Sequence, residues 1–142
     1  MFNWNVINKT YVYDGTFEGI LSMAFDCYIK KIIPFKIISK NNLEINFLDT
    51  IQDVKTDTVK AKRIFDGIHK NISYDTLYNS YYAFLSDGKE KELNILKYIL
   101  NGFVIGPKIN TMLSLDFVFA VCSMRKRMLG EAHRFKRFTS FF

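Results

Sequence analysis

The basic residues near the C-terminus are the side chains whose type and spacing most clearly suggest a chemistry. Residues 125–142 hold six basic residues and one acidic residue, whereas residues 1–124 hold 14 and 13. Phenylalanines alternate with these cations, a combination that suits phosphate oxygens and unstacked bases. Cations at the end of a helix are also stable as a plain solvated surface, so this alternative stays open. The candidate nucleic-acid-binding residues are Arg125, Lys126, Arg127, His133, Arg134, Phe135, Lys136 and Arg137.

Catalytic and metal-binding patterns are sparse. Glu131 and His133 could pair as acid and base, but two residues apart on a helix they point to different sides. Cys27 and Cys122 are far apart and no Cys-x-x-Cys motif is present, which argues against a disulfide framework or a zinc site. We expect two buried or half-buried thiols that behave as small hydrophobes. The sequence therefore predicts no catalytic residue, no metal and no cofactor.

Two further patterns allow a functional and a structural interpretation. The segment Tyr-Asp-Gly-Thr (residues 13–16) has the form of an anion cradle but lacks the glycines and lysine of a P-loop, so we expect an ordinary turn and helix cap. The four tyrosines Tyr74, Tyr78, Tyr81 and Tyr82 could stack on bases. At helical spacing they also form a packing face, and packing in the core or half-core is the interpretation we favour.

Hydrophobic spacing and capping residues predict the elements that position these side chains. Phe65 is expected on the inward face of the helix that Thr56 or Asp57 caps. We expect strands at 10–14 and 44–51 that pair with each other, and an exposed connection at 35–43. The first expected helix covers residues 16–31 and is closed by Pro34, and the second is capped by Thr56 or Asp57. The third runs from Ser73 to Gly88, and the fourth covers residues 89–101 and is ended by Gly102. A central helix is expected at residues 115–129. A glycine hairpin at 102–108 precedes the last helix and has a faint likeness to a helix-hairpin-helix DNA clamp.

Length and composition fit one domain with a real core. The chain has 142 residues, 49% of them hydrophobic and 24% charged, which excludes a disordered chain. No apolar run reaches the length of a membrane helix and the N-terminus does not look like a secretory signal, so the cytoplasm is the expected location. The fold class we predict is a mainly helical α+β domain over residues 1–142, with five to six helices and one small two-stranded sheet.

Several segments, taken in order, resemble one bacterial family. They are Tyr-Val-Tyr-Asp-Gly-Thr-Phe-Glu-Gly (residues 11–19), residues 56–57, 60–61, 67–68, 72–73, 82–86, Gly102 and Phe103 with Gly106, and Glu-Ala-His-Arg-Phe (residues 131–135). The family is one of DNA metabolism or DNA repair proteins found beside a partner radical-SAM protein, and its domain also occurs fused to uracil-DNA-glycosylase-like domains. The resemblance makes Asp14, Glu18 and Glu131 family-motif polar residues. It also makes this chain look like the N-terminal portion of longer members.

Charge and resemblance together predict a nucleic-acid-binding accessory module of a bacterial DNA repair or modification system, without catalysis of its own. DNA, bound through its phosphate backbone, is the expected partner. Two alternatives remain. One is a protein-interaction module that docks the radical-SAM partner. The other is a fragment of a glycosylase-like or nuclease enzyme.

Overall fold

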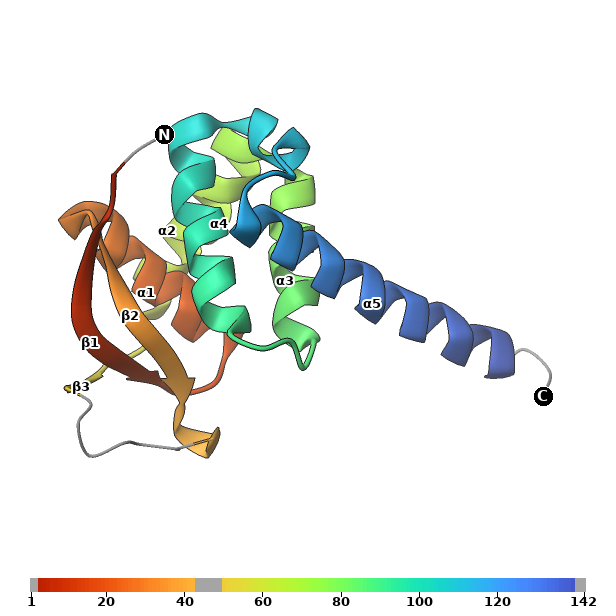
Figure 1. Cartoon of the computed structure of the whole chain (residues 1–142), viewed down its shortest axis with the longest axis horizontal. Coiled ribbons are helices and arrows are strands. Elements are labelled where there is room, and N and C mark those ends of the chain that lie inside the picture. Colours follow the sequence, from red (N-terminus) through yellow and green to blue (C-terminus); the bar gives the residue numbers. More distant parts are fainter. Residues whose placement is uncertain (1–2, 43–49, 140–142) are drawn as a thin grey trace.

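The computed structural model describes residues 3–42 and 50–139, with side chains through residue 130 (Figure 1). The fold is mainly helical with one small sheet, as the sequence predicts, but within these residues the sheet has three strands rather than two. In chain order the elements are β1 (Asn5–Tyr13), α1 (Phe17–Lys30), β2 (Ile32–Ser39), β3 (Ile51–Asp53), α2 (Thr58–Gly67), α3 (Tyr74–Leu85), α4 (Lys91–Ile105) and α5 (Asp116–Thr139).

The three strands are parallel and β1 lies in the middle, in the order β2-β1-β3. The expected exposed connection at 35–43 is wrong over its first half, because β2 extends to Ser39. Pro34 does not close the first helix. Lys31 ends it by adopting a left-handed conformation, and Pro34 lies within β2, an edge strand where a proline is tolerated.

The expected second strand at 44–51 falls mostly outside the described residues. Its last residue, Ile51, begins β3, which pairs with Thr10, Tyr11 and Val12 of β1. The expected pairing with the first strand is therefore present at this end, and it is parallel.

Three helices begin at the caps that the sequence predicts. The Thr16 hydroxyl accepts a hydrogen bond from the Gly19 amide, the Asp57 carboxylate accepts from the amides of Val59 and Lys60, and the Ser73 hydroxyl accepts from the Thr76 amide. Each such cap typically contributes about 1 kcal/mol. Local side-chain chemistry thus sets where these helices start.

Two helix ends differ from the prediction. α3 ends at Leu85, with Ser86 as its cap, rather than at Gly88. α4 runs through Gly102 to Ile105, so the glycine hairpin at 102–108 is wrong. A Cβ at position 102 would lie 2.8 Å from the Cδ1 of Ile72, which shows that this glycine permits close packing rather than ending the helix.

α4 is the central helix and contacts α1, β2, α3 and α5. Ile95, Leu96 and Tyr98 are fully buried on it. The expected central helix at 115–129 is instead the first half of α5, which buries Val118 and Val121 against the body before the helix projects away from it (Figure 1).

The segment before β1 is tied to α4 by a long-range hydrogen bond. The indole N–H of Trp4 donates to the side-chain oxygen of Asn101 over 3.1 Å. No helix among the described residues combines the length and the apolar character that crossing a membrane requires.

Candidate functional site

The turn after β1 contains the first of the family-motif residues, Asp14. Its Oδ1 accepts hydrogen bonds from the amide and the hydroxyl of Thr16, and its Oδ2 accepts one from the Thr56 hydroxyl at 2.7 Å. Partial burial acts to raise the pKa of Asp14, but these hydrogen bonds, with help from the charge of Lys40, lower it overall. Asp14 is thus an ionised carboxylate that ties the turn to the entrance of α2.

Two glycines make this turn possible. Gly15 has a φ of +84°, and a Cβ there would lie 2.8 Å from the Ser39 hydroxyl. A Cβ on Gly19 would lie 2.5 Å from Oδ1 of Asp14. The conspicuous glycines of residues 11–19 therefore serve the turn and cap that the sequence predicts, not an anion cradle.

A second feature is a row of rings along α3, which we call the aromatic row. It connects His69, Tyr74, Tyr78, Tyr82, Tyr81 and Phe17, with centroid separations of 5.9, 6.3, 4.5, 5.8 and 5.4 Å in that order. Tyr74 and Tyr81 expose 61% and 44% of their surface, so the prediction that all four tyrosines pack inward is wrong for these two. Tyr78 and Tyr82 are half-buried, as expected.

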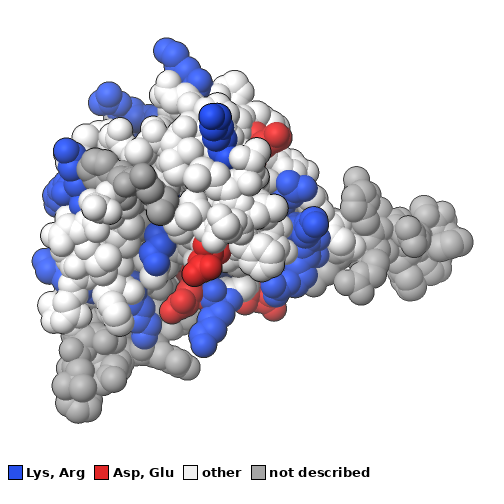
Figure 2. Space-filling model, turned by 45° about the horizontal axis from the view of Figure 1, so that its top comes forward, with Lys and Arg blue, Asp and Glu red and all other residues white. Residues whose placement is uncertain are grey.

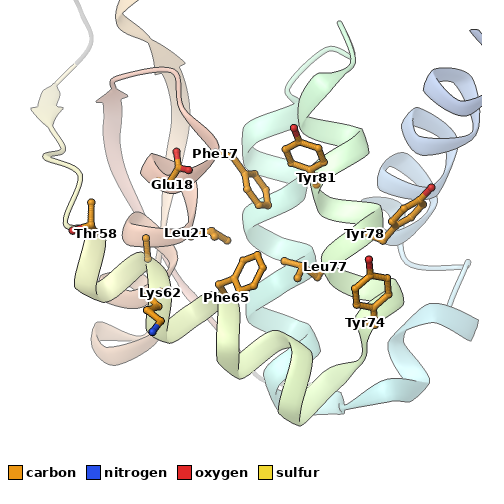
Figure 3. Close-up of a pocket in the computed structure, with 11 residues that line it drawn as sticks. Phe17, Glu18, Leu21, Thr58, Lys62, Phe65, Tyr74, Leu77, Tyr78 and Tyr81 are labelled. Carbon is orange, nitrogen blue, oxygen red and sulfur yellow. The ribbon is translucent and has the colours of Figure 1, made fainter. Parts of the chain in front are cut away.

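Between α2 and α3 lies a hollow that we call the aromatic groove (Figure 3). It has a volume of about 530 Å³. Figure 3 shows Leu21, Phe65 and Leu77 pointing toward one another across the gap, with Thr58 at the start of α2 and Lys62 about one turn further along it. Its remaining lining residues are Phe17, Glu18, Ala61, Tyr74, Tyr78 and Tyr81.

Sequence reasoning missed this groove. Phe65 was expected on the inward face of its helix, yet 45% of its surface is exposed. Ala61, Ile64 and Ile68 already supply that inward face and are buried. The signal for the groove in the sequence was the aromatic ring of Phe65, which directly follows the buried Ile64 and is not needed to complete the inward face. Glu18, the second family-motif residue, is exposed and lies at this groove.

The basic residues of α5 differ in how they are placed. Lys126 and Arg127 are exposed, and Arg127 lies 3.9 Å from the exposed carboxylate of Asp87, a pair too open to fix it strongly. Arg125 is half-buried, and its Nη1 donates to the Asn79 side-chain oxygen at 2.9 Å. The side chains of Glu131, His133, Arg134, Phe135, Lys136 and Arg137 lie outside the described part of the chain.

Arg125 also belongs to a buried polar network that joins three helices and a 3-10 turn, η3 (Pro107–Thr111). The Asn79 amide donates to the Tyr98 hydroxyl at 3.0 Å, and that hydroxyl donates to the side-chain oxygen of Asn110. The Asn110 amide donates to the Thr76 hydroxyl at 3.0 Å. The network fixes α5 against α3 and holds Arg125 beside the aromatic row.

Arg125 lies near the aromatic row, because its hydrogen-bond partner Asn79 follows Tyr78 on α3. Interaction with the Tyr82 hydroxyl raises the pKa of Tyr78, and the positive charge of Arg125 acts in the opposite direction. The aromatic row, exposed at Tyr74 and Tyr81 and half-buried at Tyr78 and Tyr82, therefore lies next to Arg125 of α5. Figure 2 shows more Lys and Arg than Asp and Glu side chains on the face that it presents.

The cysteines are placed as the sequence predicts, one buried and one half-buried. Burial raises the pKa of Cys27 to about 12, which makes its thiol unreactive at neutral pH. No group of three or more His, Cys, Asp or Glu residues that could hold a metal occurs in the described part of the chain.

Comparisons of this chain with protein-family models, with curated proteins and with solved structures found no match. Support for a function therefore comes from the arrangement of the chain's own side chains.

Proposed function

We propose that this chain binds single-stranded or locally unpaired nucleic acid and acts as a non-catalytic accessory module in DNA repair or modification. The observation that carries the proposal is the position of the aromatic row of α3 beside α5, where Arg125 donates to Asn79, the residue that follows Tyr78. The setting in DNA repair comes from the resemblance of the motif segments and is part of the same proposal.

The chemistry of the two surfaces is complementary to a single strand. Lys and Arg side chains neutralise phosphates and release counterions, and exposed rings stack on bases without a sequence preference. Lys126 and Arg127 are free to reach phosphates, since neither makes a strong contact within the described residues. The other proposed contacts are those of His133, Arg134, Phe135, Lys136 and Arg137 on the continuation of α5.

A salt titration tests the proposal. We would measure the anisotropy of a labelled single-stranded oligonucleotide with the chain and with the double variant Lys126→Ala, Arg127→Ala. Arg125 is left intact because its loss would also break the bond to Asn79. The variant should bind several-fold more weakly, and the slope of log affinity against log salt should become shallower by about 1.4.

The matched control changes two exposed lysines outside α3 and α5, as Lys30→Ala with Lys55→Ala. This control removes the same net charge and should keep most of the slope. If both double variants bind with the same affinity and slope, Lys126 and Arg127 do not contact phosphate and their assignment is wrong.

A second candidate function is docking to a protein, with the radical-SAM protein of the resembled family as the partner. It is favoured by one observation, the projection of α5 beyond the helices on which it packs (Figure 1). Helices gain most of their stability from packing, so a projecting helix is suited to a partner surface. A complex that survives high salt, with no affinity for oligonucleotides, would select this function.

A further inference from the structure

The aromatic groove has the form of a site for a flat ring. Its volume of about 530 Å³ lies within the usual range for ligand sites. Its walls come from α2 on one side and α3 on the other, with Phe17 and Leu21 of α1 between them. Phe65 and Tyr81 are each more than two-fifths exposed at this groove, which leaves aromatic faces accessible to a ligand.

The groove is continuous with the surface on which we place the nucleic acid. Tyr74, Tyr78 and Tyr81 line the groove and also belong to the aromatic row. Tyr78 precedes Asn79, whose side-chain oxygen accepts a hydrogen bond from Arg125 of α5 at 2.9 Å. A strand whose phosphates lie on α5 therefore passes over Tyr78 on its way to the groove.

Resting on the proposed function, we infer that the aromatic groove accepts one unstacked base of the bound strand. The sugar-phosphate backbone stays on the cationic face of α5, and the base enters between Phe65 of α2 and the tyrosines of α3. Stacking accounts for binding in such a site, so any of the bases is accepted. The groove itself is lined by one charge of each sign, Glu18 and Lys62, so the preference for a polyanion over an uncharged aromatic ligand comes from the cations of α5.

The test compares two probes on the intact chain. Both are single strands built from abasic nucleotides, and one of them carries a single adenine at its centre. One stacked base is worth about 5- to 150-fold in affinity, so the adenine probe should bind more tightly by a factor in that range. Both probes should show the same salt slope, because their phosphates are identical.

The variant Phe65→Leu removes a ring but keeps an apolar side chain of similar size, so the fold is retained. The matched control is Phe35→Leu, since Phe35 is 63% exposed on β2 and lies outside the groove. Phe65→Leu should lower the affinity ratio of the two probes at least threefold while the salt slope stays the same. Phe35→Leu should leave the affinity ratio and the salt slope unchanged. Tyr81→Ala, at a residue 44% exposed, provides a second groove variant with the same expected result.

Each outcome separates the two proposals. No binding of either probe at low salt would overturn nucleic-acid binding altogether. Salt-dependent binding with equal affinity for both probes would keep the proposed function and overturn the base site. A base preference that survives Phe65→Leu and Tyr81→Ala would place stacking elsewhere and leave the groove to a peptide or another apolar occupant.

Discussion

The Asp14 carboxylate joins two segments 42 residues apart, the turn after β1 and the residue that leads toward α2. Its hydrogen bonds come from two threonines and depend on its negative charge, which doubles the usual strength of such bonds. Gly19 leaves room for this side chain, because a Cβ at that position would lie 2.5 Å from Oδ1 of Asp14. At this position the motif is explained by folding rather than by chemistry on a ligand.

Replacing Asp14 with Asn should lower the free energy of unfolding by about 1 kcal/mol at pH 7, because the charge-assisted bonds are weakened. The folded-state pKa is lowered, so the contribution of Asp14 is complete above the unfolded-state value near 3.9 and is lost as the pH falls through the folded-state value. Urea unfolding from pH 7 to pH 2.5 should therefore show the difference between wild type and Asp14→Asn shrinking toward zero.

Asp66→Asn is the control, since Asp66 is exposed on α2 and makes no hydrogen bond or ion pair in the described structure. Its unfolding curve should match the wild type at every pH. A pH-independent loss in Asp14→Asn would mean that shape rather than charge holds the turn.

At the scale of elements, sequence reasoning succeeded where structure is decided locally. Thr16, Asp57 and Ser73 cap helices through amides no more than three residues away, so a short window contains the whole cause. It failed at Gly102 and Pro34, whose roles depend on distant neighbours. Gly102 accommodates Ile72 from another segment, and Pro34 is tolerated because β2, as far as the structure describes the chain, pairs with β1 on one side only.

The buried polar network holds α5 in a fixed position against α3 and α4. Asn79 is 3% exposed and serves Tyr98 and Arg125 at once. Its replacement by Ala removes both bonds, which leaves Tyr98 with Asn110 as a partner and takes from the half-buried Arg125 its bond to α3, and this should cost about 2–4 kcal/mol in urea unfolding. Asn94→Ala, at a residue that bonds only the carbonyl of Glu90 in its own helix, should stay within about 0.5 kcal/mol of wild type.

Near-equal losses in these two variants would show that the network is dispensable for stability. A large loss in Asn79→Ala alone would confirm that Arg125 is held by the fold. That result would also justify keeping Arg125 intact when phosphate contacts are mapped.

At the scale of the whole molecule, the sequence predicted the cations of the candidate site but not the aromatic groove. The excess of cations in one segment is a matter of counting, so the sequence analysis found it. The groove combines residues of α1, α2 and α3, and the extra ring of Phe65 in α2 does not by itself reveal which residues of the other two helices lie opposite it. The aromatic row needed the outward direction of Tyr74 and Tyr81, which is set by how α3 packs on α4 and α5.

A chain that ends at Gly130 should separate folding from binding. The last buried apolar residue of the described part is Met124, so we expect unfolding within about 1 kcal/mol of the full chain. The deletion removes Arg134, Lys136 and Arg137. If all three contact phosphates, the salt slope for a single strand should become shallower by about 2. An unchanged slope would confine the phosphate contacts to residues before 131.

Trp4 is the sole tryptophan of the chain, and its bond to Asn101 spans 97 positions. The fluorescence of its indole therefore reports when the N-terminal segment packs against α4. Far-ultraviolet circular dichroism, in contrast, is dominated by the helices. Because contacts between distant parts of a chain tend to form late, the two signals followed together would time the closing of the sheet against the assembly of the helical body.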